Sequence, residues 1–469
     1  MAKKPNLLFV IADQFRAMCL EPGGDPVCTP FLDALAFDGV SLANAVSNYP
    51  VCSPHRAMMM SGQYPDANGV THNVNSETAK WGVGLRPDAP SWAAVLRDSG
   101  YTTGYIGKWH LEAPIPADAL HGTGPLEDGR YWDAYSPLDR RHGFDFWYSY
   151  GCCDDHLSPH YWTGNAERHE RVDVHGWSAA HETDVALDFL RSAASEDSDA
   201  SPFALAVSWN PPHQPFDQLP EGHDTSYARL SPAELLNRPN VDLDSGTGRE
   251  AAAIAPLYYA AVSAIDTQLG RLLSALDALE LTANTLVVFT SDHGQQMGSH
   301  GLLYKNVPYE ESMRIPFVLR GPEDFSTKAA ASTVFSSVDI APTLLGLLGL
   351  GHKIPAHMQG RDLAPLLRSG AGTAPDDGAS ALYYYYPRDA LDVDIRGLRS
   401  ARTKFIARYQ RASGLTTALY DLVTDPCEQH TITDPALVRE HAKALDCALA
   451  AAGQQWTGAG ALKNLAQTA

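Results

Sequence analysis

The segment Asn6-Leu7-Leu8-Phe9-Val10-Ile11-Ala12-Asp13-Gln14 decides the fold. Its apolar run does not alternate with polar residues, which is typical of a strand that is buried on both faces of a parallel sheet. The run ends at Asp13-Gln14, and the similar run from Thr285 to Thr290 ends at Ser291-Asp292-His293-Gly294. Two such strands, each followed at once by a carboxylate, predict an α/β fold with polar groups at one edge of its sheet.

Two more strands have the same form. Residues 101–106 have the composition of a strand and precede Gly107-Lys108-Trp109-His110, and the apolar residues 203–209 precede Asn210-Pro211-Pro212-His213. Open α/β sheets bind ligands at the carboxyl ends of their strands. The polar residues after these strands are therefore the candidates for a functional site.

Helices are predicted between the strands. Trp92, Val95 and Leu96 have helical spacing, and Gly100 ends that helix. From residue 258 to residue 279, apolar side chains recur every three or four positions. A coiled coil would have this spacing too, but the pattern is short, so a helix packed on a sheet is favoured. Strand, loop and helix alternate through about the first 360 residues, which predicts a mostly parallel sheet sandwiched by helices.

The segment Ser369–Ser380 has the composition of a linker, and the pattern of predicted helices and strands changes after it. We expect a catalytic α/β domain over residues 1–370 and a small C-terminal α+β subdomain over residues 380–469. Short strand-like segments at 382–386, 396–400, 404–409 and 417–422, followed by a helix near 436–452, predict an antiparallel sheet with one helix on it.

Composition limits the classes of function. The 469 residues are 44% apolar and 19% charged, which is ordinary for a globular protein, and the net charge is −20. This charge argues against nucleic acid or an anionic membrane surface as a partner. An anionic substrate would need a locally positive site. The N-terminal apolar run is too short for a signal peptide, so we expect a cytoplasmic protein, or a periplasmic or secreted one if a leader was removed. A homo-oligomer is left open.

Of the seven cysteines, only Cys52 has a context that indicates chemistry. It begins Cys52-Ser53-Pro54-His55-Arg56, followed by small and apolar residues. If Pro54 lies in the first turn of a helix, Cys52 lies at the helix N-terminus and Arg56 about one turn further on. The N–H groups and Arg56 could then stabilise negative charge at residue 52.

Asp13, Gln14, Asp292 and His293 are candidate metal ligands. Most aspartates at strand ends are loop caps. Here each is followed by a second ligand type, and two carboxylates, an amide oxygen and an imidazole can hold a divalent cation. Lys108, His110, His213 and Lys305 are candidate cationic and acid–base groups. Each alone would be taken as structural or solvated.

Together these motifs resemble the type I, formylglycine-dependent sulfatases of the alkaline-phosphatase-like superfamily. Cys-x-Pro-x-Arg is their modification motif, Gly107-Lys108-Trp109-His110 resembles their second signature, and Leu419-Tyr420-Asp421-Leu422 with Asp425-Pro426-Cys427-Glu428 resembles a segment near their C-termini. The resemblance extends from Asp13 to about Glu428. It implies an alkaline-phosphatase-like fold, and conversion of Cys52 to formylglycine by a formylglycine-generating enzyme.

The resemblance also implies a metal site at Asp13, Gln14, Asp292 and His293, with residue 52 adding an oxygen. Calcium is the usual ion of the family. Many relatives have Asp where this chain has Gln14 and Asn where it has His293, so manganese or magnesium becomes less improbable. The Asp-His pair occurs in choline-sulfatase-like and phosphonate-monoester-hydrolase-like members.

The implied reaction is the hydrolysis of a sulfate ester. One hydroxyl of the hydrated aldehyde attacks sulfur, while Lys108, Lys305, Arg56 and the metal offset charge on the sulfuryl oxygens. His213, or Lys305 beside it, protonates the leaving oxygen. His110 then helps to deprotonate the second hydroxyl, so that sulfate departs and the aldehyde is regenerated.

The sequence says less about the substrate. Polar residues in predicted loops are candidate contacts, and they are His72, Asn73, Asp154, His156 and His160. We expect a small-molecule or oligosaccharide sulfate ester, with a sulfated carbohydrate favoured. Two alternatives remain: a phosphonate monoester or phosphodiester hydrolase with the same nucleophile, and an inactive anion- or metal-binding protein in which Cys52 is not converted.

Overall fold

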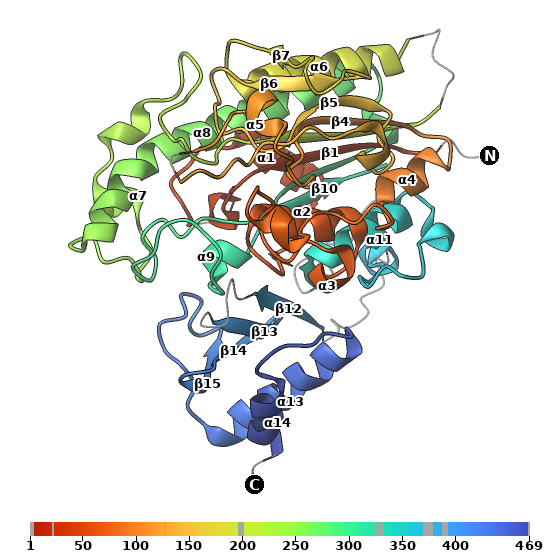
Figure 1. Cartoon of the computed structure of the whole chain (residues 1–469). Coiled ribbons are helices and arrows are strands. Elements are labelled where there is room, and N and C mark those ends of the chain that lie inside the picture. The colour runs from red at the N-terminus through yellow and green to blue at the C-terminus, as the bar shows by residue number, and fades with distance from the viewer. Residues whose placement is uncertain are drawn as a thin grey trace.

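The structure is a computed structural model that describes residues 4–20, 23–126, 128–195, 201–322, 325, 333–368, 379–386 and 393–467. Its centre is a nine-stranded sheet with the order β2-β10-β9-β1-β8-β4-β5-β6-β7 (Figure 1). The parallel middle strands are β1 (Asn6–Ala12), β4 (Thr102–Lys108), β5 (Phe146–Tyr150), β8 (Phe203–Trp209) and β9 (Thr285–Ser291). The antiparallel edge strands are β2 (Val40–Ser41), β6 (His160–Thr163), β7 (Val172–Asp173) and β10 (Phe317–Arg320). The predicted mostly parallel sheet is confirmed.

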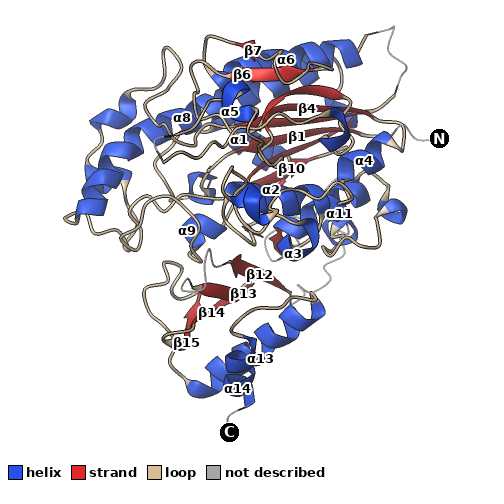
Figure 2. Cartoon of the chain, viewed as in Figure 1, coloured by secondary structure: helices blue, strands red, loops and turns tan. Residues whose placement is uncertain are grey.

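Alternate residues of β1 pack into two different cores, which explains why the strand is apolar throughout. Leu7, Phe9 and Ile11 face the core that includes α2 (Cys52–Ser61), α4 (Trp92–Arg97) and α11 (Ile340–Leu347). Leu8 and Val10 face the core that includes α1 (Pro30–Asp38), α6 (Ser178–Ala193) and α8 (Gly246–Ala278). Helices therefore cover both faces of the sheet, as Figure 2 shows.

The long helix α8 begins earlier than its apolar spacing predicts. The Ser245 hydroxyl accepts a hydrogen bond from the Gly248 N–H and caps the helix, although Pro256 lies inside it. The first part of α8 is rich in alanine and has no clear apolar stripe, so the prediction from the sequence did not include it. In the described part of the chain, no helix, α8 included, is long and apolar enough to cross a membrane.

Shorter elements complete the large unit. A parallel pair joins β3 (Asn44–Val46) to β11 (Val334–Ser336). The short helices are α3 (Pro65–Asn68), α5 (Asp118–His121), α7 (Pro232–Leu235), α9 (Glu310–Met313) and α12 (Ala364–Arg368).

The C-terminal part forms a separate antiparallel sheet below the large one (Figure 1). Its strands are β12 (Ser380–Tyr385), β13 (Asp394–Ser400), β14 (Thr403–Gln410) and β15 (Gly414–Asp421). The predicted sheet and its helix, α13 (Pro435–Ala451), are confirmed, and a second helix, α14 (Ala459–Gln467), was not predicted. Of the predicted linker, residues 369–378 lie outside the described residues, and the boundaries of the two domains stay a prediction.

Candidate active site

Asp13 and Asp292 lie side by side because β1 and β9 are neighbouring parallel strands. Ala12 pairs with Ser291 in the register of the sheet, so the next residue of each strand is its aspartate. Both carboxylates are fully buried, and the Gln14 N–H donates to Asp292 Oδ1 at 3.1 Å. The carboxyl ends of the two strands thus bring together residues that are far apart in the sequence, as predicted.

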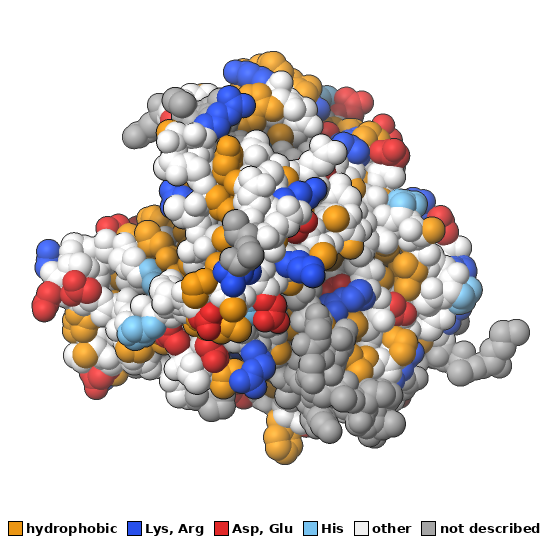
Figure 3. All heavy atoms as spheres, turned by 90° about the horizontal axis from the view of Figure 1, so that it is seen from below, with side chains coloured by type: hydrophobic (Ala, Val, Ile, Leu, Met, Phe, Trp, Pro, Cys, Tyr) orange, Lys and Arg blue, Asp and Glu red, His pale blue; other side chains and the backbone are white. Residues whose placement is uncertain are grey.

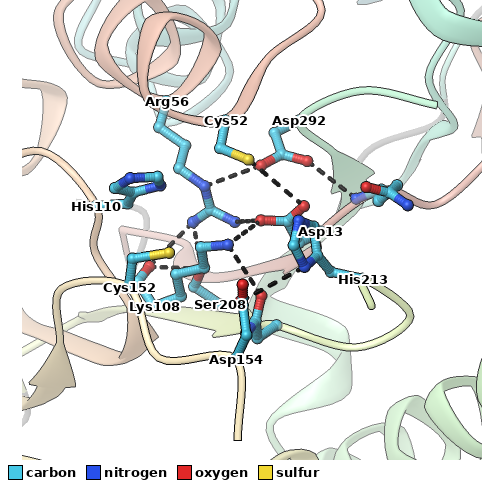
Figure 4. Close-up of polar contacts among 12 residues, drawn as sticks. Asp13, Cys52, Arg56, Lys108, His110, Cys152, Asp154, Ser208, His213 and Asp292 are labelled. Carbon is cyan, nitrogen blue, oxygen red and sulfur yellow. Dashed lines mark hydrogen bonds and ion pairs between the residues drawn. The ribbon is translucent and has the colours of Figure 1, made fainter. Parts of the chain in front are cut away.

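Cys52 meets these carboxylates from the N-terminus of α2 (Figure 4). Its Sγ lies 3.9 Å from Asp13 Oδ1 and 3.4 Å from His293 Nε2. One ligand atom from each of Asp13, Cys52, Asp292 and His293 lies within 4.8 Å of all the others. His293 Nδ1 donates to the Gly294 carbonyl at 3.0 Å, which leaves the lone pair on Nε2, the atom that faces the cluster. These residues fit a divalent cation, because two buried carboxylates supply charge and the imidazole presents a free lone pair.

Arg56 donates hydrogen bonds to both aspartates. Its Nε donates to Asp292 Oδ2 at 2.9 Å and its Nη2 to Asp13 Oδ2 at 3.2 Å, while Nη1 donates to the Lys108 carbonyl and to Ser208 Oγ. We expected Arg56 to stabilise charge at residue 52. Its position one turn along α2 is confirmed, but these hydrogen bonds direct the guanidinium to the carboxylates.

Lys108 is the last residue of β4, and its ammonium group is fully buried beside Asp13. Nζ lies 2.7 Å from Asp13 Oδ2 and donates to Asn210 Oδ1 at 2.9 Å. Burial alone would lower the pKa of Lys108, but the Asp13 carboxylate holds this pKa well above its ordinary value, so the side chain is charged. Oδ2 of Asp13 thus contacts two cations, and Oδ1 faces the candidate metal-binding cluster.

The field of these groups reaches Cys52. Burial and the Asp13 carboxylate both raise the pKa of the Cys52 thiol, but nearby cations, Lys305 and then Lys108, hold it well below its ordinary value. The site is therefore locally positive within a chain of net charge −20. This is the condition that an anionic substrate requires.

His110 has a φ of 55°, so the segment after Lys108 is not extended. Its Nε2 donates to the Val74 carbonyl at 3.0 Å, and its Nδ1 is buried without a hydrogen-bond partner among the described residues. Because a carbonyl can only accept, Nε2 carries a proton, and in the neutral imidazole the lone pair lies on Nδ1. The predicted role of His110 in the reaction stays a prediction.

Lys305 is linked to the cluster by a hydrogen bond to Gln14, and His213 lies in the segment that follows β8. Lys305 Nζ donates to Gln14 Oε1 at 2.7 Å, and Gln14 Nε2 donates to Gln214 Oε1 at 3.2 Å. The amide oxygen predicted to bind a metal thus accepts from Lys305, and the assignment of Gln14 as a ligand stays a prediction. His213 Nδ1 donates to the Gln214 carbonyl at 2.8 Å, so Nε2 is the ring nitrogen left to exchange a proton.

Two of the predicted substrate residues support His213. Asp154 Oδ1 lies 3.5 Å from His213 Nδ1 and accepts from Asn210 Nδ2 at 3.0 Å. His156 Nε2 donates to the His213 carbonyl at 2.8 Å. His160, by contrast, pairs with Asp133 at 2.7 Å, away from the four-residue cluster.

The other two lie near the first turn of α2. His72 and Asn73 line a small hollow, whose wall includes Trp81, Trp132 and Tyr386. Asn73 Oδ1 also accepts from the Ser53 N–H at 2.9 Å, so this residue supports the first turn of α2.

Sequence reasoning missed Ser208 and Asn210. Ser208 Oγ accepts from Arg56 Nη1 at 2.7 Å, and Asn210 links Lys108 to Asp154. Asn210 follows β8 directly, in the place that Asp13 and Asp292 occupy after their strands. The same signal could therefore have found it.

Comparisons with known proteins agree with this geometry. The sulfatase family model matches residues 5–350, and a model for the C-terminal part of N-sulphoglucosamine sulphohydrolase matches residues 298–455. The chain is 39% identical to an endo-4-O-sulfatase of Bacteroides thetaiotaomicron, with 92% of this chain and 88% of that protein covered. It is 33% identical to an ulvan-active sulfatase of Formosa agariphila, over 92% of this chain and 77% of that protein.

Solved structures show the same fold. A putative sulfatase from Bacteroides fragilis superposes with a TM-score of 0.89 at 34% identity, covering 100% of this chain and 99% of that one. A phosphonate monoester hydrolase of Agrobacterium radiobacter superposes with a TM-score of 0.68 at 24% identity, covering 96% of each chain. At that identity the second likeness shows the fold alone.

Proposed function

The chain belongs to the sulfatase family, and we propose that it releases inorganic sulfate from a sulfated carbohydrate, with formylglycine made from Cys52 as nucleophile and one divalent cation. The observation that carries this proposal is the cluster of Asp13, Cys52, Asp292 and His293, whose ligand atoms lie within 4.8 Å of one another. A carboxylate pair, a free imidazole lone pair and the residue of the modification motif meet at one point.

The cation would be held by Asp13, Asp292, His293 and the oxygen that conversion places at residue 52. It would supply Lewis acidity, which lowers the pKa of a bound hydroxyl and offsets charge on the ester oxygens. We propose calcium, because buried carboxylates are the hard ligands that this ion prefers. The nitrogen of His293 keeps manganese and magnesium as alternatives.

The side chains around the cluster can bind the ester and transfer protons. Lys108 is held charged beside Asp13, and Lys305 Nζ lies on Gln14 at the other side, so the two can contact sulfuryl oxygens. His213, oriented by Gln214 and Asp154, is placed to protonate the leaving oxygen at Nε2. His110 Nδ1 carries a lone pair and can accept a proton from residue 52.

A carbohydrate is the substrate class that the surroundings favour. The hollow beside Cys52 is lined by Trp81, Trp132 and Tyr386, and aromatic rings give broad contact area at low entropic cost. Arg130 lies on the same wall and can pair with an anionic substituent. The similar proteins include an endo-4-O-sulfatase and an ulvan-active sulfatase, which supports this choice.

Hydrolysis of a phosphonate monoester or phosphodiester is the second candidate. The observation that favours it is His293 in the metal cluster, which brings nitrogen into a site otherwise made of oxygen and sulfur donors. An unconverted, inactive binding protein is the third candidate, and it depends only on the chemical state of Cys52.

Three measurements on the purified protein test the proposal. Intact mass should show a loss of about 18 Da at residue 52, the difference between a thiol and an aldehyde side chain. Metal analysis should find one bound divalent ion per chain. Sulfate release from N-acetylgalactosamine 4-sulfate and from 4-nitrophenyl sulfate should exceed the turnover of 4-nitrophenyl phenylphosphonate. Faster phosphonate turnover would favour the second candidate, and an unchanged mass would favour the third.

A further inference from the structure

The C-terminal sheet has one face that its own helices do not cover. Leu382, Phe405 and Leu419 point to the opposite face, where they pack with α13 residues such as Leu445 and Leu449. Since side chains alternate across a strand, their neighbours on β12 to β15 point toward the large domain.

Three rows of paired residues cross this second face. The row nearest the large domain contains Arg399 and Lys404, which form buried ion pairs with Glu310. The next row contains Tyr383 and Ile406, which pack with Met313. These two rows fix the subdomain to the large domain.

The third row is open to solvent. Tyr385, Ile395, Arg408 and Thr416 pair in register from β12 to β15. All four line a groove of about 720 Å³, within the ~300–1,000 Å³ that ligand sites typically occupy. The opposite wall of the groove is the segment 302–309, which carries Lys305.

The groove continues into the active site. It shares Asn306 and Tyr385 with the small hollow beside Cys52, and Lys305 lies on its wall. The hollow measures about 70 Å³, so it has room for little beyond the group next to the nucleophile. Any longer substrate has to extend into a larger space, and the groove joins the hollow at Asn306 and Tyr385.

Arg408 is the cation of the third row. Its side chain is exposed, and its guanidinium forms no hydrogen bond or ion pair with the residues that the structure describes. Figure 3 looks onto this end of the molecule and shows basic and acidic side chains interspersed, without a broad basic patch. An anionic chain must therefore be bound by individual cations, and Arg408 is available for this.

We propose that this groove binds the sugar residues that continue the substrate chain beyond the sulfated one, with Arg408 pairing with a carboxylate or sulfate group on them. The inference rests on the proposed function and specifies the length of its substrate. The substrate is an anionic oligosaccharide or polysaccharide rather than a single sugar. It also assigns the C-terminal sheet a part in substrate recognition.

The test compares a polymer with a single sugar. Arg408→Ala should lower kcat/KM for desulfation of chondroitin 4-sulfate by about tenfold, which is the usual effect of losing a hydrogen bond to a charged group. The same variant should desulfate N-acetylgalactosamine 4-sulfate at the wild-type rate. Arg411→Ala is the matched control, because Arg411 is also exposed but lies in the turn after β14, outside the groove lining. It should leave both rates unchanged.

Two results would contradict the proposed role of the groove in substrate binding. One is wild-type activity of Arg408→Ala on the polymer, and the other is an equal loss on both substrates with an unchanged melting temperature. Sulfate release by the wild-type protein decides the proposed function independently. If the wild type, with residue 52 converted, released sulfate from neither substrate, the proposed function would fail and this inference with it.

Discussion

At the scale of single residues, the site is organised by the two oxygens of Asp13. Oδ2 accepts from Arg56 and lies 2.7 Å from the Lys108 ammonium, while Oδ1 faces Cys52 and His293. Burial would raise the pKa of Asp13, but Lys108 and the other nearby cations hold it well below its ordinary value. The carboxylate stays ionised, as a cation ligand must be.

Replacing the nucleophile should abolish turnover and preserve the fold. Cys52→Ala removes one sulfur atom from the start of α2, and the helix hydrogen bonds remain. We expect no measurable sulfate release and nearly unchanged circular dichroism. Cys447→Ala, the same change at an exposed cysteine, should keep full activity. Near-normal turnover by Cys52→Ala would show that another group attacks the ester.

Removing one negative charge from the cluster should weaken metal binding. Asp292→Asn keeps the size of the side chain but leaves Arg56 less well paired, and we expect at least about tenfold weaker affinity for the ion. Metal analysis after dialysis against buffered chelator measures this. Asp154→Asn changes a carboxylate outside the cluster and should retain the metal. Unchanged metal content in Asp292→Asn would remove this residue from the site.

Single residues were predictable where sequence position alone decides their place. Asp13 and Asp292 follow apolar strands directly, so the edge of the sheet could be read from the sequence. The hydrogen bonds of Arg56 to Asp292 and to Ser208 could not, because they join segments 236 and 152 residues apart. The pairing of His160 with Asp133 could not be read either, since Asp133 lies on a loop with no recognisable pattern.

At the scale of elements, α2 is held in place by a reciprocal link to the following loop. Asn73 Oδ1 accepts from the Ser53 N–H, and Ser53 Oγ accepts from the Val74 N–H at 3.0 Å. The first N–H groups of a helix have no partner within it, so Asn73 supplies one from outside. A residue that we predicted as a substrate contact thus supports the helix that carries the nucleophile.

Kinetics can separate these two roles of Asn73. Asn73→Ala should lower the free energy of unfolding by about 1 kcal/mol, the usual cost of a lost helix cap, and should lower kcat with little change in KM. Asn75→Ala removes a comparable amide that accepts from the N–H groups of Glu77 and Thr78, and it should leave kcat intact. Urea unfolding and steady-state kinetics give both readouts. A raised KM with normal kcat in Asn73→Ala would instead support the substrate role.

Elements with strong local signals were predicted closely, and those defined by tertiary contact were not. Strands β1, β8 and β9 have continuous apolar runs, and their predicted positions are confirmed. The first part of α8 and the whole of α14 were missed. Only Leu462 of α14 is buried, and its nine residues are too few to establish a helical spacing from the sequence.

At the scale of the whole molecule, buried ion pairs join the C-terminal sheet to the large domain. Lys404 Nζ lies 2.8 Å from Glu310 Oε1 and 2.8 Å from Glu428 Oε1, so two carboxylates share one ammonium group. Burial raises the pKa of Glu428 to about 7; the Glu310 carboxylate adds to this rise, and Lys404 opposes it. The interface therefore prefers Glu428 protonated.

This preference predicts how stability depends on pH. Because the folded-state pKa of Glu428 lies above its ordinary value of 4.5, the folded protein holds a proton that the unfolded chain releases between these two values. The wild type should lose up to about 1.4 kcal/mol per pH unit between pH 5 and 7, relative to Glu428→Gln, and the two curves should run parallel above pH 8. Calorimetric melting from pH 5 to pH 8.5 measures the difference. A constant difference across this range would contradict the raised pKa.

The burial of α2 has a consequence for how an active molecule is made. All ten residues of the helix are buried, and Cys52 is 2% exposed. If Cys52 is converted to formylglycine, the oxidising enzyme would have to reach it before α2 is buried. Conversion and folding would then compete on each new chain. A molecule that folded first would keep its thiol, and the active fraction of a preparation would be decided during synthesis.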